Sequence, residues 1–176
     1  MSHSVRNRRA RFLAAAEGYL TLGMAEHALR TLREIEDPDQ ALFQVNYLKG
    51  EAFKHLERHA EALVAYGRAF AEQPDHVDLL MGMAWCFKRT DQLPKAITAM
   101  ERAYQIAPKE PVILYNLSCY WSLARNKTQA LSWLGRALRM DQNLRRLIDE
   151  ETDFDPLRSD PDFRLIVGGA ATTQGK

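Results

Sequence analysis

The sequence predicts an all-α fold, an α-α superhelix in which antiparallel helix pairs stack one after another. Three observations predict it. Residues of one class recur every 34 positions along most of the chain, apolar residues within each segment follow helical spacing, and prolines stand where a helix pair would end. A fixed period of this length is the signature of a repeat array whose units bury their faces against their neighbours.

The period is visible in four columns of residues. One column is all alanine, and the other three are mainly aromatic, branched aliphatic and small. The columns are Ala28, Ala62, Ala96 and Ala130; Tyr19, Phe53, Phe87 and Trp121; Leu29, Leu63, Ile97 and Leu131; and Ala16, Gly50, Ala84 and Ser118. Antiparallel helices approach closely only where the side chains between them are short, which explains the small columns. We predict repeats over 9–42, 43–76, 77–110 and 111–144.

Each repeat contains two stretches with helical spacing, separated by a short polar turn. In the third repeat, apolar residues from Leu80 to Phe87 mark the first helix, and those from Ile97 to Tyr104 mark the second. The turn between them contains Asp91, which can cap free amide groups, and Pro94, which the first turn of a helix tolerates. Proline after the second helix stops it and leads into the next pair.

The two ends depart from the period. Residues 1–8 are a basic N-terminal segment whose arginines could contact an acidic partner or remain solvated. Residues 145–167 alternate apolar and charged groups and are predicted to be a helical cap over the last repeat. The acidic cluster in this cap lacks the spacing of a calcium loop and is expected to be solvated. Residues 168–176 are predicted to be a disordered tail.

The second repeat carries a recognisable pattern of small, aromatic, alanine and proline positions. It consists of Gly50, Phe53, Ala62, Tyr66, Ala69 and Pro74. This pattern resembles the tetratricopeptide repeat family over residues 9–144, with departures at Ile35, Gln40, Asn46 and Gln142. The resemblance implies a solenoid whose first helices line a concave, peptide-binding groove. The family's groove positions fall on Ala10, Leu13, Glu17 and Leu20; Gln44, Tyr47, Glu51 and Lys54; Asp78, Met81, Trp85 and Lys88; and Val112, Tyr115, Cys119 and Ser122.

Aromatic and methionine side chains are concentrated at these groove positions, and such residues are enriched at binding hot spots. The predicted partner-binding residues are Tyr47, Glu51, Lys54, Asp78, Met81, Trp85, Lys88, Tyr115 and Cys119. The charged members are expected to orient an extended or helical peptide that carries apolar anchors. Alternatively, the terminal segments cover part of this face, or the face closes a homodimer. The groove does not carry the residues with which co-chaperone members of the family clamp a terminal carboxylate.

We therefore expect a non-catalytic adaptor or scaffold that binds a protein or peptide, and the alternative is a dedicated chaperone that holds an export client. We expect no enzyme activity, cofactor or metal, because catalytic motifs are missing and a helix break is predicted between His55 and His59. The charges nearly balance, with 24 Lys and Arg against 23 Asp and Glu, so nucleic acid is not an expected partner. No apolar run is long enough to insert into a membrane. Two reduced cysteines and a cytoplasmic location complete the expectation.

Overall fold

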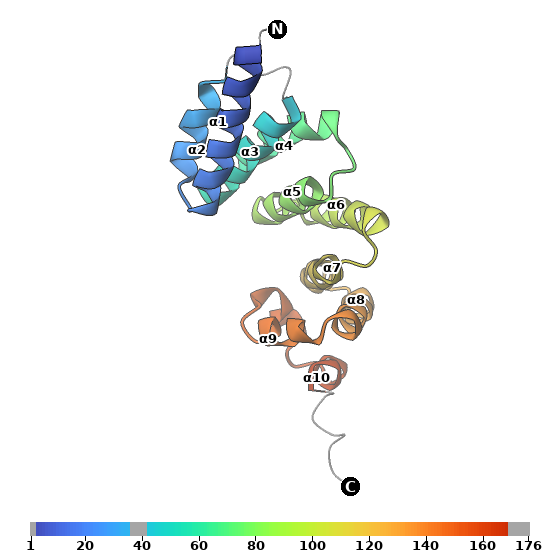
Figure 1. The fold of residues 1–176 in the computed structure, drawn as a ribbon. Coiled ribbons are helices and arrows are strands. Elements are labelled where there is room, and N and C mark those ends of the chain that lie inside the picture. The colour runs from blue at the N-terminus through green and yellow to red at the C-terminus, as the bar shows by residue number, and fades with distance from the viewer. Residues whose placement is uncertain (1–2, 36–41, 169–176) are drawn as a thin grey trace. The chain divides into compact units, whose positions relative to one another are not determined.

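The computed structural model describes residues 3–35 and 42–168, with side chains from residue 6 onward, and all regular structure in these ranges is helical. The chain forms two compact units, unit 1 within residues 1–92 and unit 2 within residues 93–176 (Figure 1). Unit 1 contains α1 (His3–Thr21), α2 (Ala25–Arg33), α3 (Leu42–His55), α4 (His59–Glu72) and α5 (Val77–Arg89). Unit 2 contains α6 (Leu93–Ile106), α7 (Pro111–Leu123), α8 (Lys127–Met140), η2 (Gln142–Leu144), α9 (Arg145–Ile148), η3 (Thr152–Leu157) and α10 (Pro161–Gly168). The predicted tail after residue 168 lies outside the described residues.

In unit 1, α1 packs against α2, α2 against α3, α3 against α4 and α4 against α5. In addition, α3 contacts both α1 and α5, so the first helices of successive pairs lie side by side. Helix α1 begins at His3 and therefore includes much of the predicted basic N-terminal segment. Asn46, one of the departures from the family pattern, is 4% exposed, and its Nδ2 donates to the Leu42 carbonyl at 2.8 Å. The polar side chain is thus satisfied within its own helix.

The small columns of the sequence are buried. Ala28, Ala62, Ala96 and Ala130 are each 0% exposed. Ala16, Gly50, Ala84 and Ser118 are buried as well. All eight small positions are therefore interior, as expected for side chains between packed helices.

The backbone repeats with the same period. Positive φ angles occur at Gly23 (72°), Glu57 (57°), Asp91 (57°) and Arg125 (59°), which are 34 residues apart. Each ends a first helix, and the next residue donates its backbone N–H to a carbonyl five residues earlier. These bonds are Met24 to Tyr19 (2.8 Å), Arg58 to Phe53 (2.9 Å), Gln92 to Phe87 (2.9 Å) and Asn126 to Trp121 (3.0 Å). A left-handed residue closed by such a bond is a Schellman cap, which turns the chain tightly toward the second helix.

Gly23 is the one glycine among these four left-handed positions, so its backbone is unstrained there. We expect Gly23→Ala to lower the free energy of unfolding by about 1 kcal/mol, because a Cβ is disfavoured at positive φ. Gly18→Ala, within α1, is the matched control, since nothing lies within 4 Å of a Cβ at that position. It is expected to stabilise the protein slightly. Urea denaturation followed by circular dichroism measures both, and equal effects would contradict the interpretation.

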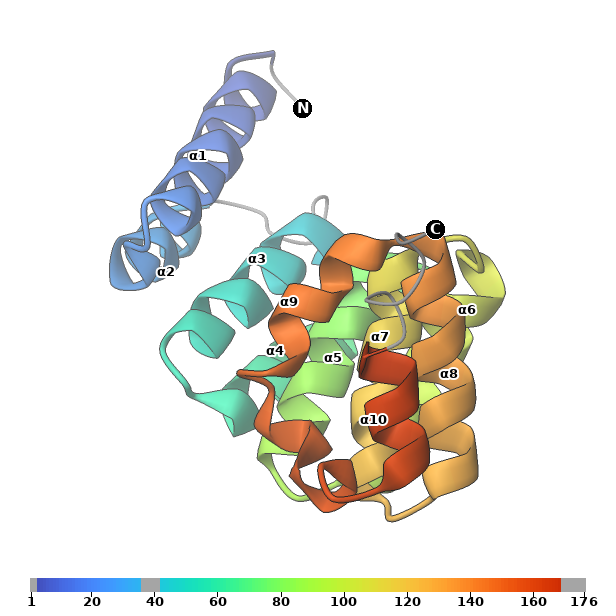
Figure 2. The same cartoon turned by 90° about the horizontal axis from the view of Figure 1, so that it is seen from below.

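In unit 2, α7 packs against α6 and α8. The residues after 144 fold back onto α7 and α8. The 3-10 helix η3 contacts α7, and α10 contacts α8 (Figure 2). Phe154 and Phe163 are 0% and 3% exposed, so this segment contributes apolar side chains to the core of the unit. Lys127 of α8 pairs with Asp160 at 2.6 Å and with Asp162 at 2.7 Å. Among the described residues, no helix combines the length and apolar character needed to span a bilayer.

Candidate binding site

Tyr47 of α3 is the centre of an aromatic cluster in unit 1. The Phe43 ring, one turn earlier, stacks on it at 5.7 Å with an interplanar angle of 4°. Tyr66 of α4 lies 6.3 Å from the Tyr47 ring, and His76, which precedes α5, lies 5.3 Å from it. His76 caps α5, because its Nδ1 accepts the Leu79 backbone N–H at 3.3 Å. Three elements therefore hold the half-buried Tyr47 side chain in place.

The Tyr66 side chain lies between Gly50 and Gly82 and reaches the carboxylate of Glu51. A Cβ at Gly50 would lie 2.3 Å from Tyr66 Cδ1, and a Cβ at Gly82 would lie 2.7 Å from its Oη. The Tyr66 hydroxyl donates to Glu51 Oε1 at 2.5 Å. Glu51 Oε2 accepts a hydrogen bond from Lys54 Nζ at 2.7 Å. Both oxygens of Glu51 are thus held, and a predicted binding residue is given a defined orientation.

Carboxylates on three helices lie close enough to Tyr47 to act on its hydroxyl. Burial is the main cause of a raised pKa at its hydroxyl, and the charges of Glu51, Asp78 and Glu17 raise that pKa further. These carboxylates belong to α3, α5 and α1 respectively. Glu17 and Asp78 are exposed, whereas Glu51 is partly buried. The side-by-side first helices of unit 1 therefore create a region of negative charge around one tyrosine.

Helix α5 adds an exposed aromatic residue to this side of the unit. The Trp85 side chain is 43% exposed. Lys88 Nζ lies 4.7 Å from its ring centroid, and Arg89 Cζ lies 6.0 Å from it, within the range of cation–π attraction. Asp78, Met81, Trp85 and Lys88 recur at helical spacing, so they share one stripe of α5. We call the following set the first-helix face of unit 1: Glu17, Tyr47, Glu51, Lys54, Asp78, Met81, Trp85 and Lys88.

The predicted binding residues of α7 are placed differently. Tyr115 and Cys119 are 4% and 2% exposed, because η3 covers this side of α7. The Phe154 ring meets the Tyr115 ring edge-on, with centroids 5.7 Å apart. For these two residues the structure shows the alternative arrangement, in which a terminal segment covers part of the predicted groove. Neither side chain is therefore accessible to a binding partner.

The acidic cluster after α9 also differs from expectation. Asp149, Glu150 and Asp155 are exposed, as expected for solvated charges. Asp153 is only 8% exposed and Glu151 is partly buried, so the prediction of a fully solvated cluster is wrong for these two. The apolar residues of η3 draw the neighbouring carboxylates inward when they pack on α7.

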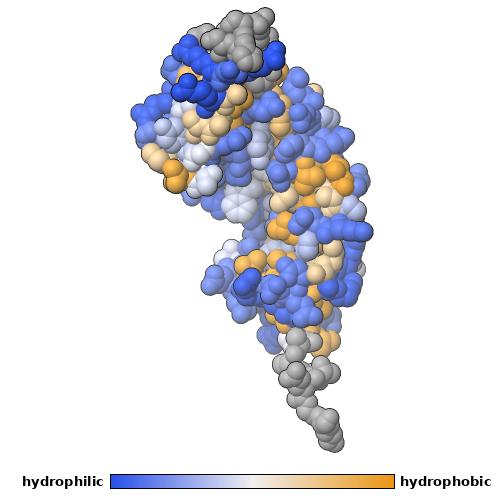
Figure 3. Space-filling view, viewed as in Figure 1, coloured by the Kyte–Doolittle hydropathy of each residue, from blue (hydrophilic) through white to orange (hydrophobic). Residues whose placement is uncertain are grey.

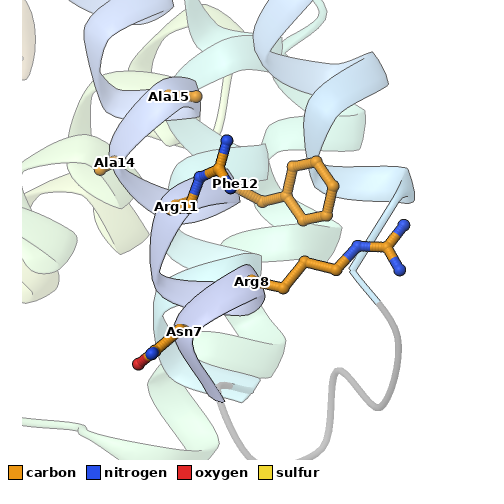
Figure 4. Close-up of a pocket in the computed structure, with 6 residues that line it drawn as sticks. All are labelled: Asn7, Arg8, Arg11, Phe12, Ala14 and Ala15. Atoms are coloured by element: carbon orange, nitrogen blue, oxygen red, sulfur yellow. The ribbon is translucent and has the colours of Figure 1, made fainter. Parts of the chain in front are cut away.

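Other surface features contain none of the predicted binding residues. A hollow along α1 is lined by Asn7, Arg8, Arg11, Phe12, Ala14 and Ala15. Figure 4 shows these side chains on α1, with the Arg8 guanidinium beside the Phe12 ring, 5.6 Å from its centroid. On the face shown in Figure 3, hydrophobic residues form separate patches among hydrophilic ones. As predicted, α3 ends at His55 and α4 begins at His59, so the two histidines do not share a helix.

Sequence reasoning overlooked the part that His76 and the two glycines play in holding Tyr47 and Glu51. A usable signal was present, because Gly50 and Gly82 are glycines at helix-interior positions, where glycine is normally disfavoured. Such a residue implies that another group approaches the backbone closely. The approaching group, Tyr66, could not be identified without the packing of α4 between α3 and α5.

Comparisons with known proteins agree with the helical repeat fold. Residues 55–113 match the family model described as Tetratricopeptide repeat. No curated protein matches the chain. Among solved structures, a crystal structure of MamA has a TM-score of 0.69 at 18% identity, covering 77% of this chain and 79% of that one. A structure of pilF from Pseudomonas aeruginosa has a TM-score of 0.71 at 19% identity, covering 98% and 79%.

A third solved structure is YrrB, described as a TPR protein with an unusual peptide-binding site. It has a TM-score of 0.68 at 14% identity, covering 90% of this chain and 89% of that one. Identities at this level establish a shared fold and nothing more. Residues 55–113 thus match a tetratricopeptide repeat, and most of the chain shares the fold of these solved structures.

Proposed function

We propose that the chain is a non-catalytic protein-interaction module that binds a peptide segment of a partner on the first-helix face of unit 1. The observation that supports this best is the convergence of Glu17, Glu51 and Asp78 around Tyr47. Beside it, α5 presents the exposed Trp85. An aromatic anchor next to oriented charges has the composition of a binding hot spot. The peptide-binding site attributed to YrrB shows that this fold accommodates such a role.

The charges of this face favour a particular peptide. Lys54 is already paired with Glu51, and Lys88 lies over Trp85, so the local cations are engaged within the protein. The exposed carboxylates of Glu17 and Asp78 remain as the outer charges near Tyr47. A peptide with a lysine or arginine and an apolar side chain complements this arrangement. Electrostatic complementarity of this kind contributes mainly to specificity and to the association rate.

The polar groups of unit 1 support a binding role rather than a catalytic one. Glu51 is bonded at both oxygens, which leaves it poorly suited to accept a proton from a substrate. Burial raises the pKa of the Cys86 thiol to about 11, so the thiol is protonated and unreactive at neutral pH. These groups act in packing and orientation.

Peptide selection from a random phage library, followed by affinity measurement, tests the proposal. We expect enriched peptides to combine Lys or Arg with aromatic or aliphatic residues. Trp85→Ala should weaken the binding of a selected peptide at least about tenfold. Val64→Ala is the matched control, because Val64 is 60% exposed but lies on the second helix α4. Selection of acidic peptides, or equal affinity for both variants, would contradict the proposal.

Two further measurements on the same protein distinguish peptide binding from a chaperone role and from homodimer formation. A chaperone would suppress aggregation of an unfolded client without enriching a short motif, and Trp85→Ala would reduce that suppression. A homodimer through this face would appear as a concentration-dependent mass in sedimentation that Trp85→Ala reduces. Either result without peptide enrichment would replace the proposed peptide-binding role.

A further inference from the structure

A second group of polar side chains lies inside unit 2, where η3 packs on α7. It consists of Cys119 on α7, Glu151 immediately before η3 and Asp153 within η3. The thiol sulfur and one oxygen of each carboxylate all lie within 4.8 Å of one another. Cys119 is 2% exposed and Asp153 is 8% exposed. Two carboxylates and a thiol are thus brought together by tertiary packing in a largely buried place.

Tyr115 provides an independent observation at the same place. It stands one turn before Cys119 on α7 and is 4% exposed. Its buried hydroxyl has no hydrogen-bond partner, although buried tyrosine hydroxyls usually find one. Burial is the main cause of its raised pKa, and the charges of Cys119, Glu151 and Asp153 follow. The hydroxyl therefore lies within electrostatic reach of these three groups and has no partner, which a species bound among them would supply.

We propose that Cys119, Glu151 and Asp153 bind one divalent transition-metal cation, and that this cation is Zn²⁺. A sulfur ligand excludes Ca²⁺ and Mg²⁺, which require oxygen, whereas zinc accepts both thiolate and carboxylate. With Zn–S of about 2.3 Å and Zn–O of about 2.1 Å, tetrahedral ligand atoms stand about 3.5 Å apart. Small side-chain adjustments bring the three atoms to that spacing. The fourth position can hold water, to which Tyr115 donates.

The backbone that carries the two carboxylates is already ordered. Arg158 Nη2 donates to the carbonyls of Ile148 (3.2 Å), Asp149 (3.0 Å) and Glu151 (3.0 Å). The backbone N–H of Asp153 donates to Glu151 Oε1 at 3.1 Å. A site whose ligands are positioned in advance loses little conformational entropy on binding the metal. The cation would join η3 to α7 and also neutralise buried negative charge, which is a structural role.

Cobalt titration of the chelator-treated full-length protein tests the site. We expect one Co²⁺ per chain with a thiolate-to-cobalt charge-transfer band, and competition by one equivalent of Zn²⁺. Cys119→Ala should abolish the band, and Asp153→Asn should weaken Zn²⁺ binding at least about tenfold. Cys86→Ala is the matched control, because Cys86 is the other buried cysteine and lies in unit 1. It should retain the band.

Two further measurements keep the inference testable if Cys119→Ala does not fold. Glu151→Gln changes a partly exposed ligand, and it should also weaken Zn²⁺ binding at least about tenfold. The Tm of the unmodified protein should rise as free Zn²⁺ increases above its Kd. No charge-transfer band in the unmodified protein, or a band that survives Cys119→Ala or is lost in Cys86→Ala, would overturn the proposed site.

Discussion

Gly50→Ala is expected to lower the free energy of unfolding of unit 1 by about 2 kcal/mol, although alanine is the better helix former. The added Cβ would stand 2.3 Å from Tyr66 Cδ1. Tyr66 is 0% exposed and is confined on its other side by Gly82, so the ring has nowhere to move. Overpacking of this kind costs about 1–3 kcal/mol and outweighs the gain in helix propensity. Urea denaturation of the purified variant measures the change.

Two matched variants separate overpacking from helix propensity. Gly67 is an interior position of α4 with nothing within 4 Å of a Cβ, so Gly67→Ala should stabilise the protein by about 0.5–1 kcal/mol. Tyr66→Phe should relieve part of the Gly82→Ala clash, which involves the hydroxyl (2.7 Å) and Cζ (2.9 Å), but none of the Gly50→Ala clash, which involves ring carbons alone. Stabilisation by Gly50→Ala, or equal relief of both clashes, would show that Tyr66 is not confined in this way.

The parts of the fold that depend on local sequence could be predicted. Helix spacing and the small columns were sufficient because each repeat packs mainly against its neighbours in the chain. The burial of Ala28 and Ala62 follows from that rule. The left-handed turns share the period, although Glu57 and Arg125 give no glycine signal for them. Backbone geometry imposed by the repeat outweighs the local preference of these residues.

The candidate site was less predictable because it depends on contacts between distant residues. Position within a repeat was enough to select Tyr47 and Trp85 as candidate binding residues. It could not show that η3 would cover Tyr115 and Cys119, because this contact joins α7 to residues more than 30 positions later in the chain. The same packing brings a buried carboxylate to Cys119. Spacing rules for metal ligands consider neighbours in sequence and therefore overlook such a group.

The packing of η3 on α7 also makes α7 differ from the first helices of unit 1. On α3 and α5 the family's binding positions remain partly or fully exposed, as at Tyr47 and Trp85. On α7 the equivalent residues Tyr115 and Cys119 are buried, and the Tyr115 ring packs against Phe154. The same repeat position is therefore accessible in one unit and part of the core in the other. This difference is the reason for restricting the proposed peptide site to unit 1.

Phe154→Ala is expected to lower the free energy of unfolding of unit 2 by about 3–5 kcal/mol, the cost of removing a fully buried phenylalanine. Phe154 is 0% exposed. Its ring centroid lies 5.7 Å from that of Tyr115 and 5.4 Å from that of Phe163. Its loss opens a cavity among three elements at once. Thermal denaturation followed by circular dichroism should show a lowered Tm, and hydrogen exchange should show faster exchange in α7.

Leu165→Ala provides the matched control within the same segment. Leu165 is on α10 and is 73% exposed, so its truncation should change the stability by less than about 0.5 kcal/mol. If η3 were only loosely attached to α7, the two variants would have similar small effects, and exchange in α7 would not change. A large effect confined to Phe154→Ala would instead mean that the residues after the last long helix belong to the core of unit 2, since their apolar side chains complete the packing around α7.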